Sequence, residues 1–116
     1  MASRIRPNAL LSILASTLLF SLSPHASAAD EEAAKELARA NNCFKCHGIS
    51  KAKDGPSWTS VAEKLRGNPD AETKLIRHLT TGEMAKFPDG HEEHHKIINT
   101  KDMGQIKNLV NWILSL

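Results

Sequence analysis

The clearest regular pattern of apolar positions lies near the end of the chain. Apolar residues recur there at spacings of three and four, at Ile106, Leu109, Val110, Ile113 and Leu114. This spacing places them on one stripe of an α-helix. Thr100 or Asp102 stands just before the stripe and can cap the first turn, because a short polar side chain accepts hydrogen bonds from unpaired backbone N–H groups. The sequence therefore predicts a closing helix with an apolar face.

Three further segments have helical character. Residues 30–40 are rich in Ala, Glu, Lys and Leu, begin with acidic side chains and run into Asn41-Asn42, an arrangement that favours a helix and then a stop. Residues 58–65 and 70–80 predict shorter helices. The second of these follows Pro69, carries Leu75, Ile76 and Leu79 on one face and ends before Gly82. We expect the first and last helices to pack together.

No segment shows the alternation that is typical of a β-strand. The segments 48–57 and 83–99 are dense in Lys, Gly, Pro, Asp and His, so they are expected to be loops. We therefore predict an all-α fold. The loop over 83–99 is long for so small a domain, and long ordered loops are usually functional. A bound cofactor would explain it.

The beginning of the chain has the features of an export signal. Arg4 and Arg6 precede an apolar run over 9–22, and the small residues Ala26-Ser27-Ala28 follow. The run is shorter than the roughly 20 residues that span a bilayer, so we predict a cleaved signal peptide over 1–28, a single domain over 29–116 and no stable membrane anchor. Without the two arginines the formal charges balance, which indicates neither nucleic acid nor a membrane surface as a partner.

The candidate chemistry lies in Cys43-Phe44-Lys45-Cys46-His47, which contains the only two cysteines of the chain. C-x-x-C-H is the attachment signature of haem c. Two thiols at this spacing can add to the two vinyl groups along one edge of a porphyrin, and the adjacent His reaches the iron. A plain disulfide and a zinc site that uses the later histidines are the alternatives, whereas a thioredoxin-like pair would require a βαβ surround.

With this motif the chain resembles the class I cytochromes c, in particular the short bacterial monohaem type. Gly55-Pro56 and a closing helix that ends in Trp112-Ile113-Leu114 extend the resemblance over the predicted domain. It implies crossed terminal helices around one covalently bound haem, and a carbonyl of Pro56 that accepts the free N–H of His47. Pro56 as a simple turn residue after Gly55 is the alternative. Candidates for the haem crevice, which any helical core would also contain, are Phe44, Trp58, Leu65, Leu75, Ile76, Leu79 and Trp112.

The sequence departs from this family at the sixth iron ligand. The resemblance implies an axial Met in a loop not far before the chain end, where this chain instead has His91, His94 and His95. Met84 is too early for that position and Met103 too late. Imidazole is a good iron ligand, so we expect His95, with His94 and His91 behind it. A His-rich loop without iron, or a rearranged loop that brings in a methionine, stays open as an alternative.

These features predict a periplasmic one-electron carrier rather than an enzyme. Its expected partners are periplasmic or membrane redox proteins and the machinery that attaches the haem. A His-ligated iron should have a lower midpoint potential than the His/Met members of the family. The alternative is an open sixth site that binds small gases or reduces peroxide. Lys45, Lys51 and Lys53 can form a basic rim that steers acidic partners, or can be ordinary solvated loop lysines.

Overall fold

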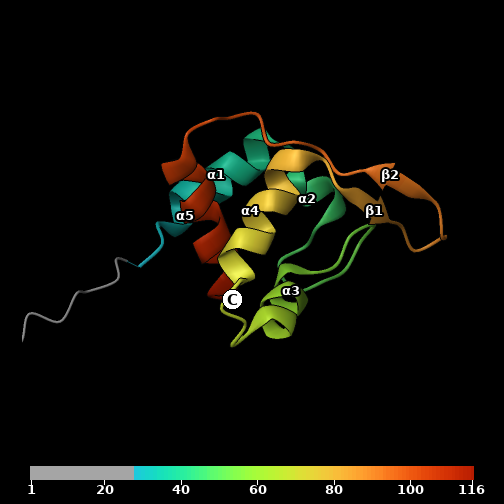
Figure 1. Cartoon of the computed structure of the whole chain (residues 1–116), viewed down its shortest axis with the longest axis horizontal. Coiled ribbons are helices and arrows are strands. Elements are labelled where there is room, and N and C mark those ends of the chain that lie inside the picture. Colours follow the sequence, from blue (N-terminus) through green and yellow to red (C-terminus); the bar gives the residue numbers. More distant parts are fainter. Residues whose placement is uncertain (1–27) are drawn as a thin grey trace, which may run out of the picture.

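The computed structural model describes residues 28–116. The predicted signal peptide over 1–28 therefore lies outside the described residues, apart from Ala28. The elements run in the order α1 (Glu31–Ala40), α2 (Cys43–Cys46), α3 (Trp58–Leu65), α4 (Ala71–Thr81), β1 (Met84–Lys86), β2 (Glu92–His94) and α5 (Met103–Leu114) (Figure 1). Among these described helices, none combines the length and the apolar character needed to cross a bilayer. The all-α fold class is confirmed, and the four longer helices lie where the sequence predicts them.

The helix ends follow from local hydrogen bonds. Asp30 precedes α1 and its carboxylate accepts the N–H of Ala33 at 3.0 Å. Asp102 does the same for α5, where it accepts the N–H of Gly104 at 2.9 Å. Thr100 instead accepts the N–H of Asp102 at 3.1 Å, so Asp102 is the cap and Thr100 supports it. At the other end of α4, Gly82 is in the left-handed region with φ 65°, which a glycine adopts without strain.

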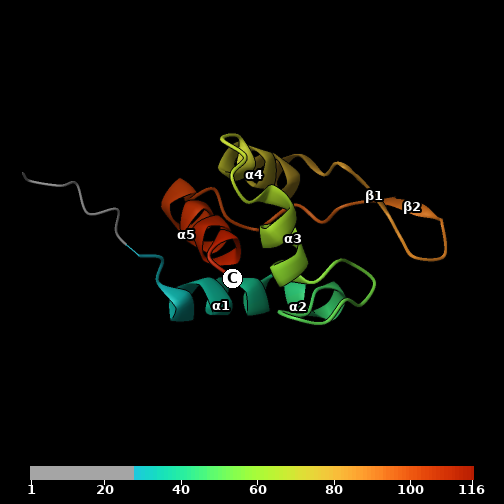
Figure 2. The same cartoon turned by 90° about the horizontal axis from the view of Figure 1, so that it is seen from below.

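The core lies where α1 and α5 cross, and α5 is placed between α1 and α4 (Figure 2). Ala34 and Ala38 on α1 are fully buried, and their small side chains let α5 approach closely. From α3, Trp58 meets Trp112 edge to face, with ring centroids 5.4 Å apart. The buried apolar residues of α5 include all but one of its predicted stripe: Ile106, Leu109, Val110 and Ile113.

A two-stranded antiparallel hairpin lies within residues 83–99, where the sequence predicts a loop. β1 pairs with β2 so that Met84 faces His94 and Lys86 faces Glu92, and the hairpin projects from the helical body (Figure 1). The expectation of a segment without strands is wrong here. Both strands are largely exposed, so no apolar alternation marks them. The turn fixes the pairing instead, through the N–H of Gly90 to the carbonyl of Phe87 and the N–H of Phe87 to the carbonyl of His91, both at 2.9 Å.

Candidate haem site

The C-x-x-C-H motif forms the short helix α2 directly after α1. Asn42 precedes it in the left-handed region, with φ 58°, a conformation that Asn tolerates better than most residues. The N–H of His47 closes the turn by donating to the carbonyl of Cys43 at 3.0 Å. Both thiols are half-buried and free, so they form no disulfide. Burial raises the pKa of the Cys43 thiol, and the nearby Lys96 ammonium partly opposes this.

Both thiols and His47 line a cavity of about 1110 Å³. This volume exceeds the roughly 300–1,000 Å³ of pockets that take drug-sized molecules. Its apolar walls come from three helices and one loop, through Trp58, Val61, Leu65, Leu75, Leu79, Ile98, Leu109 and Ile113. Four of the residues expected in the crevice are among them: Trp58, Leu65, Leu75 and Leu79. The other three, Phe44, Ile76 and Trp112, belong to the adjoining hydrophobic core instead.

His47 is held in one orientation by the loop that follows it. Its Nδ1 donates to the carbonyl of Pro56 at 2.8 Å, which leaves Nε2 free for a metal. The ring also stacks on Trp58, with an interplanar angle of 17°. Gly55 lies so close that a Cβ there would come within 2.5 Å of the ring. The loop after the motif therefore fits the back of His47 closely, as a fixed iron ligand requires.

His95 lies opposite His47, with 6.1 Å between the two ring centroids. A metal ion between two imidazoles at bonds of about 2.0 Å would place the centroids roughly 6.3 Å apart, when the radius of each ring is added. Nδ1 of His95 is buried and has no hydrogen-bond partner. Burial lowers the pKa of His95, and the imidazoles of His78 and His47 lower it further, so the ring is neutral and able to bind a metal.

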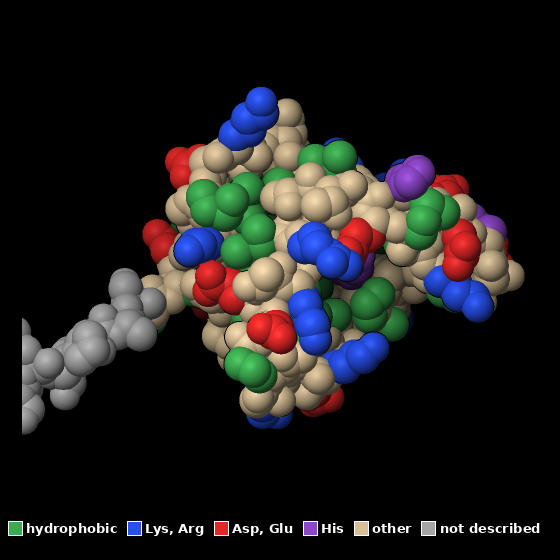
Figure 3. All heavy atoms as spheres, in the orientation of Figure 1, with side chains coloured by type: hydrophobic (Ala, Val, Ile, Leu, Met, Phe, Trp, Pro, Cys, Tyr) green, Lys and Arg blue, Asp and Glu red, His purple; other side chains and the backbone are tan. Residues whose placement is uncertain are grey.

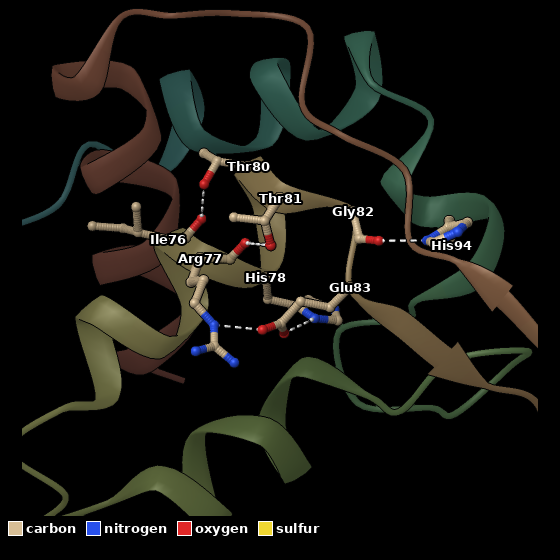
Figure 4. Close-up of polar contacts among 8 residues, drawn as sticks. All are labelled: Ile76, Arg77, His78, Thr80, Thr81, Gly82, Glu83 and His94. Carbon is tan, nitrogen blue, oxygen red and sulfur yellow. Dashed lines mark hydrogen bonds and ion pairs between the residues drawn. The ribbon is translucent and has the colours of Figure 1, made fainter.

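The other two histidines of the predicted set, His94 and His91, are held by other contacts. His94 lines the cavity, but its Nδ1 donates to the carbonyl of Gly82 at 2.8 Å and so closes the end of α4 (Figure 4). His91 lies at the tip of the hairpin, where it pairs with Asp89 and stacks on Phe87 with centroids 4.3 Å apart. It does not line the cavity. Of the three, only His95 meets the ring of His47.

Both described methionines are exposed. Met84 is 53% exposed, and its neighbour on β1, Ala85, lines the cavity in its place. Met103 begins α5 and is 45% exposed. Within residues 28–116, no methionine lines the cavity.

His78 is a cavity residue that the sequence analysis missed. Its ring centroid is 4.0 Å from that of His95, and its Nδ1 is 3.5 Å from a carboxylate oxygen of Glu83 (Figure 4). Glu83 also accepts from Arg77 at 2.5 Å, a bond that holds the pKa of the Glu83 carboxyl below its ordinary range. The helical pattern contained the signal, since His78 is three residues after Leu75 on the same face of α4.

Charged side chains surround this cavity in mixed order. Lys and Arg alternate with Asp and Glu across the face that carries the hairpin (Figure 3). The cavity is lined by the cationic side chains of Lys45, Lys74, Arg77 and Lys96. Lys53 donates to the carbonyl of Phe44, which lies in the turn from Cys43 to His47 that we call the attachment turn. In the described part of the chain, no three His, Cys, Asp or Glu side chains are grouped as a metal-ion site.

Comparison with known proteins identifies the family. The model of the cytochrome c family matches residues 31–116, which is most of the chain. The chain belongs to the cytochrome c family. Cytochrome c-551 of Allochromatium vinosum is 31% identical over 80 residues, which cover 69% of this chain and 82% of the relative. Cytochrome c2 of Rhodocyclus tenuis is 33% identical over 89 residues, which cover 76% and 94%.

Solved structures agree with this cytochrome in fold. The class 1 cytochrome MtoD of Sideroxydans lithotrophicus ES-1 is 68% identical, covers 76% of this chain and 97% of its own, and has a TM-score of 0.74. Cytochrome c552 of Nitrosomonas europaea is 28% identical, with coverages of 70% and 96% and a TM-score of 0.56. The short class I type is thereby confirmed, and with it an electron carrier. Membership implies covalent haem c, which the cavity and its two thiols fit.

Proposed function

We propose that this cytochrome c is a periplasmic one-electron carrier whose single haem c is attached through Cys43 and Cys46 and ligated by His47 and His95. The observation that carries the axial assignment is the 6.1 Å between the ring centroids of the two histidines, which suits two imidazoles on one iron. The unpaired, buried Nδ1 of His95 supports it, because buried polar atoms in native proteins normally have a partner.

The residues of the site orient both proposed ligands. Pro56 fixes the tautomer of His47, and Gly55 leaves room for its ring. The N–H of His95 donates to the carbonyl of Glu83 at 2.8 Å, which holds the ligand segment at the end of α4. Apolar walls from α3, α4 and α5 exclude water. The haem, when bound, supplies an iron that changes its oxidation state by one electron, and two strong protein ligands leave no position for a substrate.

The proposed location rests on the first 28 residues, and the proposed partners rest on lysines close to Cys43 and Cys46. A cleaved signal peptide over 1–28 would export the chain to the periplasm, where haem attachment machinery acts on Cys43 and Cys46. Lys45 lines the cavity and Lys53 is bound to the attachment turn, so both are placed to steer acidic redox partners. Lys51 is exposed on the same loop.

The decisive experiment removes the proposed sixth ligand. His95→Ala should convert ferric low-spin haem to high spin and let the ferrous protein bind carbon monoxide, because it removes the imidazole whose ring lies 6.1 Å from that of His47. His94→Ala and His91→Ala are the matched controls and should stay low-spin. Absorption spectra of each purified protein, with and without carbon monoxide, give the result. A low-spin, carbon-monoxide-insensitive His95→Ala protein would refute the assignment, and binding of carbon monoxide by the wild type would favour an open site.

A second experiment links the ligand to the potential. A thioether favours ferrous iron more than an imidazole does, so the wild type should have a lower midpoint than His/Met cytochromes c. His95→Met should therefore shift the midpoint upwards in a redox titration. His94→Met serves as the control and should leave the midpoint unchanged, since His94 is bound to Gly82. A wild-type midpoint in the His/Met range would count against His95 as a ligand.

A further inference from the structure

The segment that carries His95, residues 95–99, has no helix or strand of its own. We call it the distal segment. Three backbone N–H groups attach it to the rest of the protein. His95 donates to the carbonyl of Glu83 and Ile98 to the carbonyl of Leu79, each at 2.8 Å, while Asn99 donates to the side chain of Asn41 at 2.7 Å. The acceptors Leu79 and Glu83 lie on α4 and just after it. The third acceptor, Asn41, lies at the end of α1, on the side of the cavity that carries His47.

Asn41 is built into the junction between α1 and α2. It is one of the few buried polar residues, with 5% of its surface exposed. Its side chain uses both ends, because Nδ2 donates to the carbonyl of Leu37 at 3.0 Å and Oδ1 accepts from Asn99. Its own carbonyl accepts from Nζ of Lys96 at 3.1 Å. Two residues of the distal segment are therefore bound to one residue that stands just before the attachment turn.

We propose that Asn41 is a positioning residue that latches the distal segment to the attachment turn and so limits how fast His95 leaves the iron. The inference rests on the proposed ligation by His95. His47 is fixed to α2, and α2 is contiguous with Asn41. The bonds to Leu79 and Glu83 fix the distal segment to α4. The Asn41 bonds join it directly to the junction between α1 and α2, on the side of the cavity that carries His47.

Loss of the latch predicts a kinetic effect at the iron. A fixed distal segment must open before an external ligand can replace His95, and that opening breaks the bond between Asn41 and Asn99. Removing the bond in advance lowers the barrier to opening without touching either imidazole. The rate of ligand replacement should therefore respond more strongly than the global stability does.

The test measures cyanide binding to the ferric holoprotein by stopped flow. In the wild type the rate should reach a plateau at high cyanide, because opening then limits it. Asn41→Ala should raise the plateau about tenfold, as expected for loss of a buried hydrogen bond. Asn41→Asp keeps the Oδ1 acceptor for Asn99 but loses the Nδ2 donor to Leu37, so its plateau should rise less than that of Asn41→Ala. A plateau in Asn41→Ala that matches the wild type would overturn the proposal.

Asn108→Ala is the matched control. Asn108 also makes two long-range bonds, since its side chain accepts from the N–H of Asp30 and donates to the carbonyl of Asp30, each at 2.8 Å. These bonds join α5 to the start of α1 and lie away from the distal segment. The plateau should change less than about twofold, because distant sites act independently. An increase as large as that of Asn41→Ala would mean general loosening and would overturn the latch.

Two further measurements separate this inference from the ligand assignment. His95→Ala should bind cyanide without a plateau, and a retained plateau there would refute ligation by His95, and with it any effect of the latch on the iron. Hydrogen exchange on the wild-type holoprotein tests the latch without any variant. The Asn99 amide should exchange at least about 100-fold more slowly than in an unfolded chain, together with that of His95. Exchange of Asn99 at the unprotected rate would overturn the latch.

Discussion

The two sides of the cavity are built in different ways. On the proximal side, Cys43, His47 and Pro56 lie within one short stretch, and the bond from His47 to Pro56 spans nine residues. On the distal side, His95 follows a hairpin, and the bond from Asn99 to Asn41 spans 58 residues. His47 is therefore fixed by its neighbours in sequence. His95 is fixed by contacts that exist only after α1 and α4 have come together.

The largest effect is expected when haem attachment is removed, on the side of the cavity that carries His47. Replacing both Cys43 and Cys46 by Ala should abolish covalent haem and leave a chain that does not fold stably, because so small a core depends on its cofactor. A haem stain after denaturing electrophoresis measures attachment, and circular dichroism measures the fold. Lys45→Ala lies between the two cysteines and should stain normally. Haem that survived denaturation in the double variant would disprove the attachment assignment.

A smaller effect is expected when the space behind the ring of His47 is filled. Gly55→Ala places a Cβ within 2.5 Å of the imidazole, so ring or loop must shift at a cost of about 1–3 kcal/mol. For a domain of this size each kcal/mol lowers the melting temperature by roughly 4–8 °C. The axial bond should change as well, which the absorption spectrum reports. Gly104→Ala lies at the start of α5, far from His47, and should leave the spectrum unaltered. Equal spectra for both variants would show that the loop is not tight.

The smallest expected effect concerns the hairpin on the distal side. The imidazole of His91 hydrogen-bonds the carboxylate of Asp89, which raises the pKa of His91 above its ordinary 6.5. The backbone N–H and the ring of His91 both bond this carboxylate and lower the pKa of Asp89 below its ordinary 3.8. The contribution of His91 is complete below pH 6.5 and is lost as the pH rises through its raised pKa. The contribution of Asp89 is complete above pH 3.8 and is lost as the pH falls through its lowered pKa.

The hairpin turn should therefore be most stable between these two limits. Exchange of the Gly90 amide, which is bonded to Phe87, should be slower at pH 5.5 than at pH 8.5 after correction for the intrinsic rate. Asp89→Asn is the control and should remove this difference. A pH titration of His91 by NMR with a midpoint at or below its ordinary value would contradict the pairing.

Local signals in the sequence were sufficient for the helices. The sequence predicts a helix start at Asp30, another at Thr100 or Asp102 and a stop at Gly82, because capping involves only residues within one turn. The hairpin was missed for the opposite reason. Its strands are too short and too exposed to leave an apolar pattern, and a turn at Gly90 fixes their pairing.

What the sequence determined by itself is the attachment turn, because the spacing of Cys43, Cys46 and His47 is itself the geometry that a haem c requires. The sequence also named His91, His94 and His95 as candidate sixth ligands and favoured His95. Only the tertiary structure shows how their surroundings differ, since His94 donates to Gly82, His91 lies at the hairpin tip and the ring of His95 lies 6.1 Å from that of His47. The physical reason is that adjacent residues on one loop differ in function through contacts to distant helices, and no local pattern encodes those contacts.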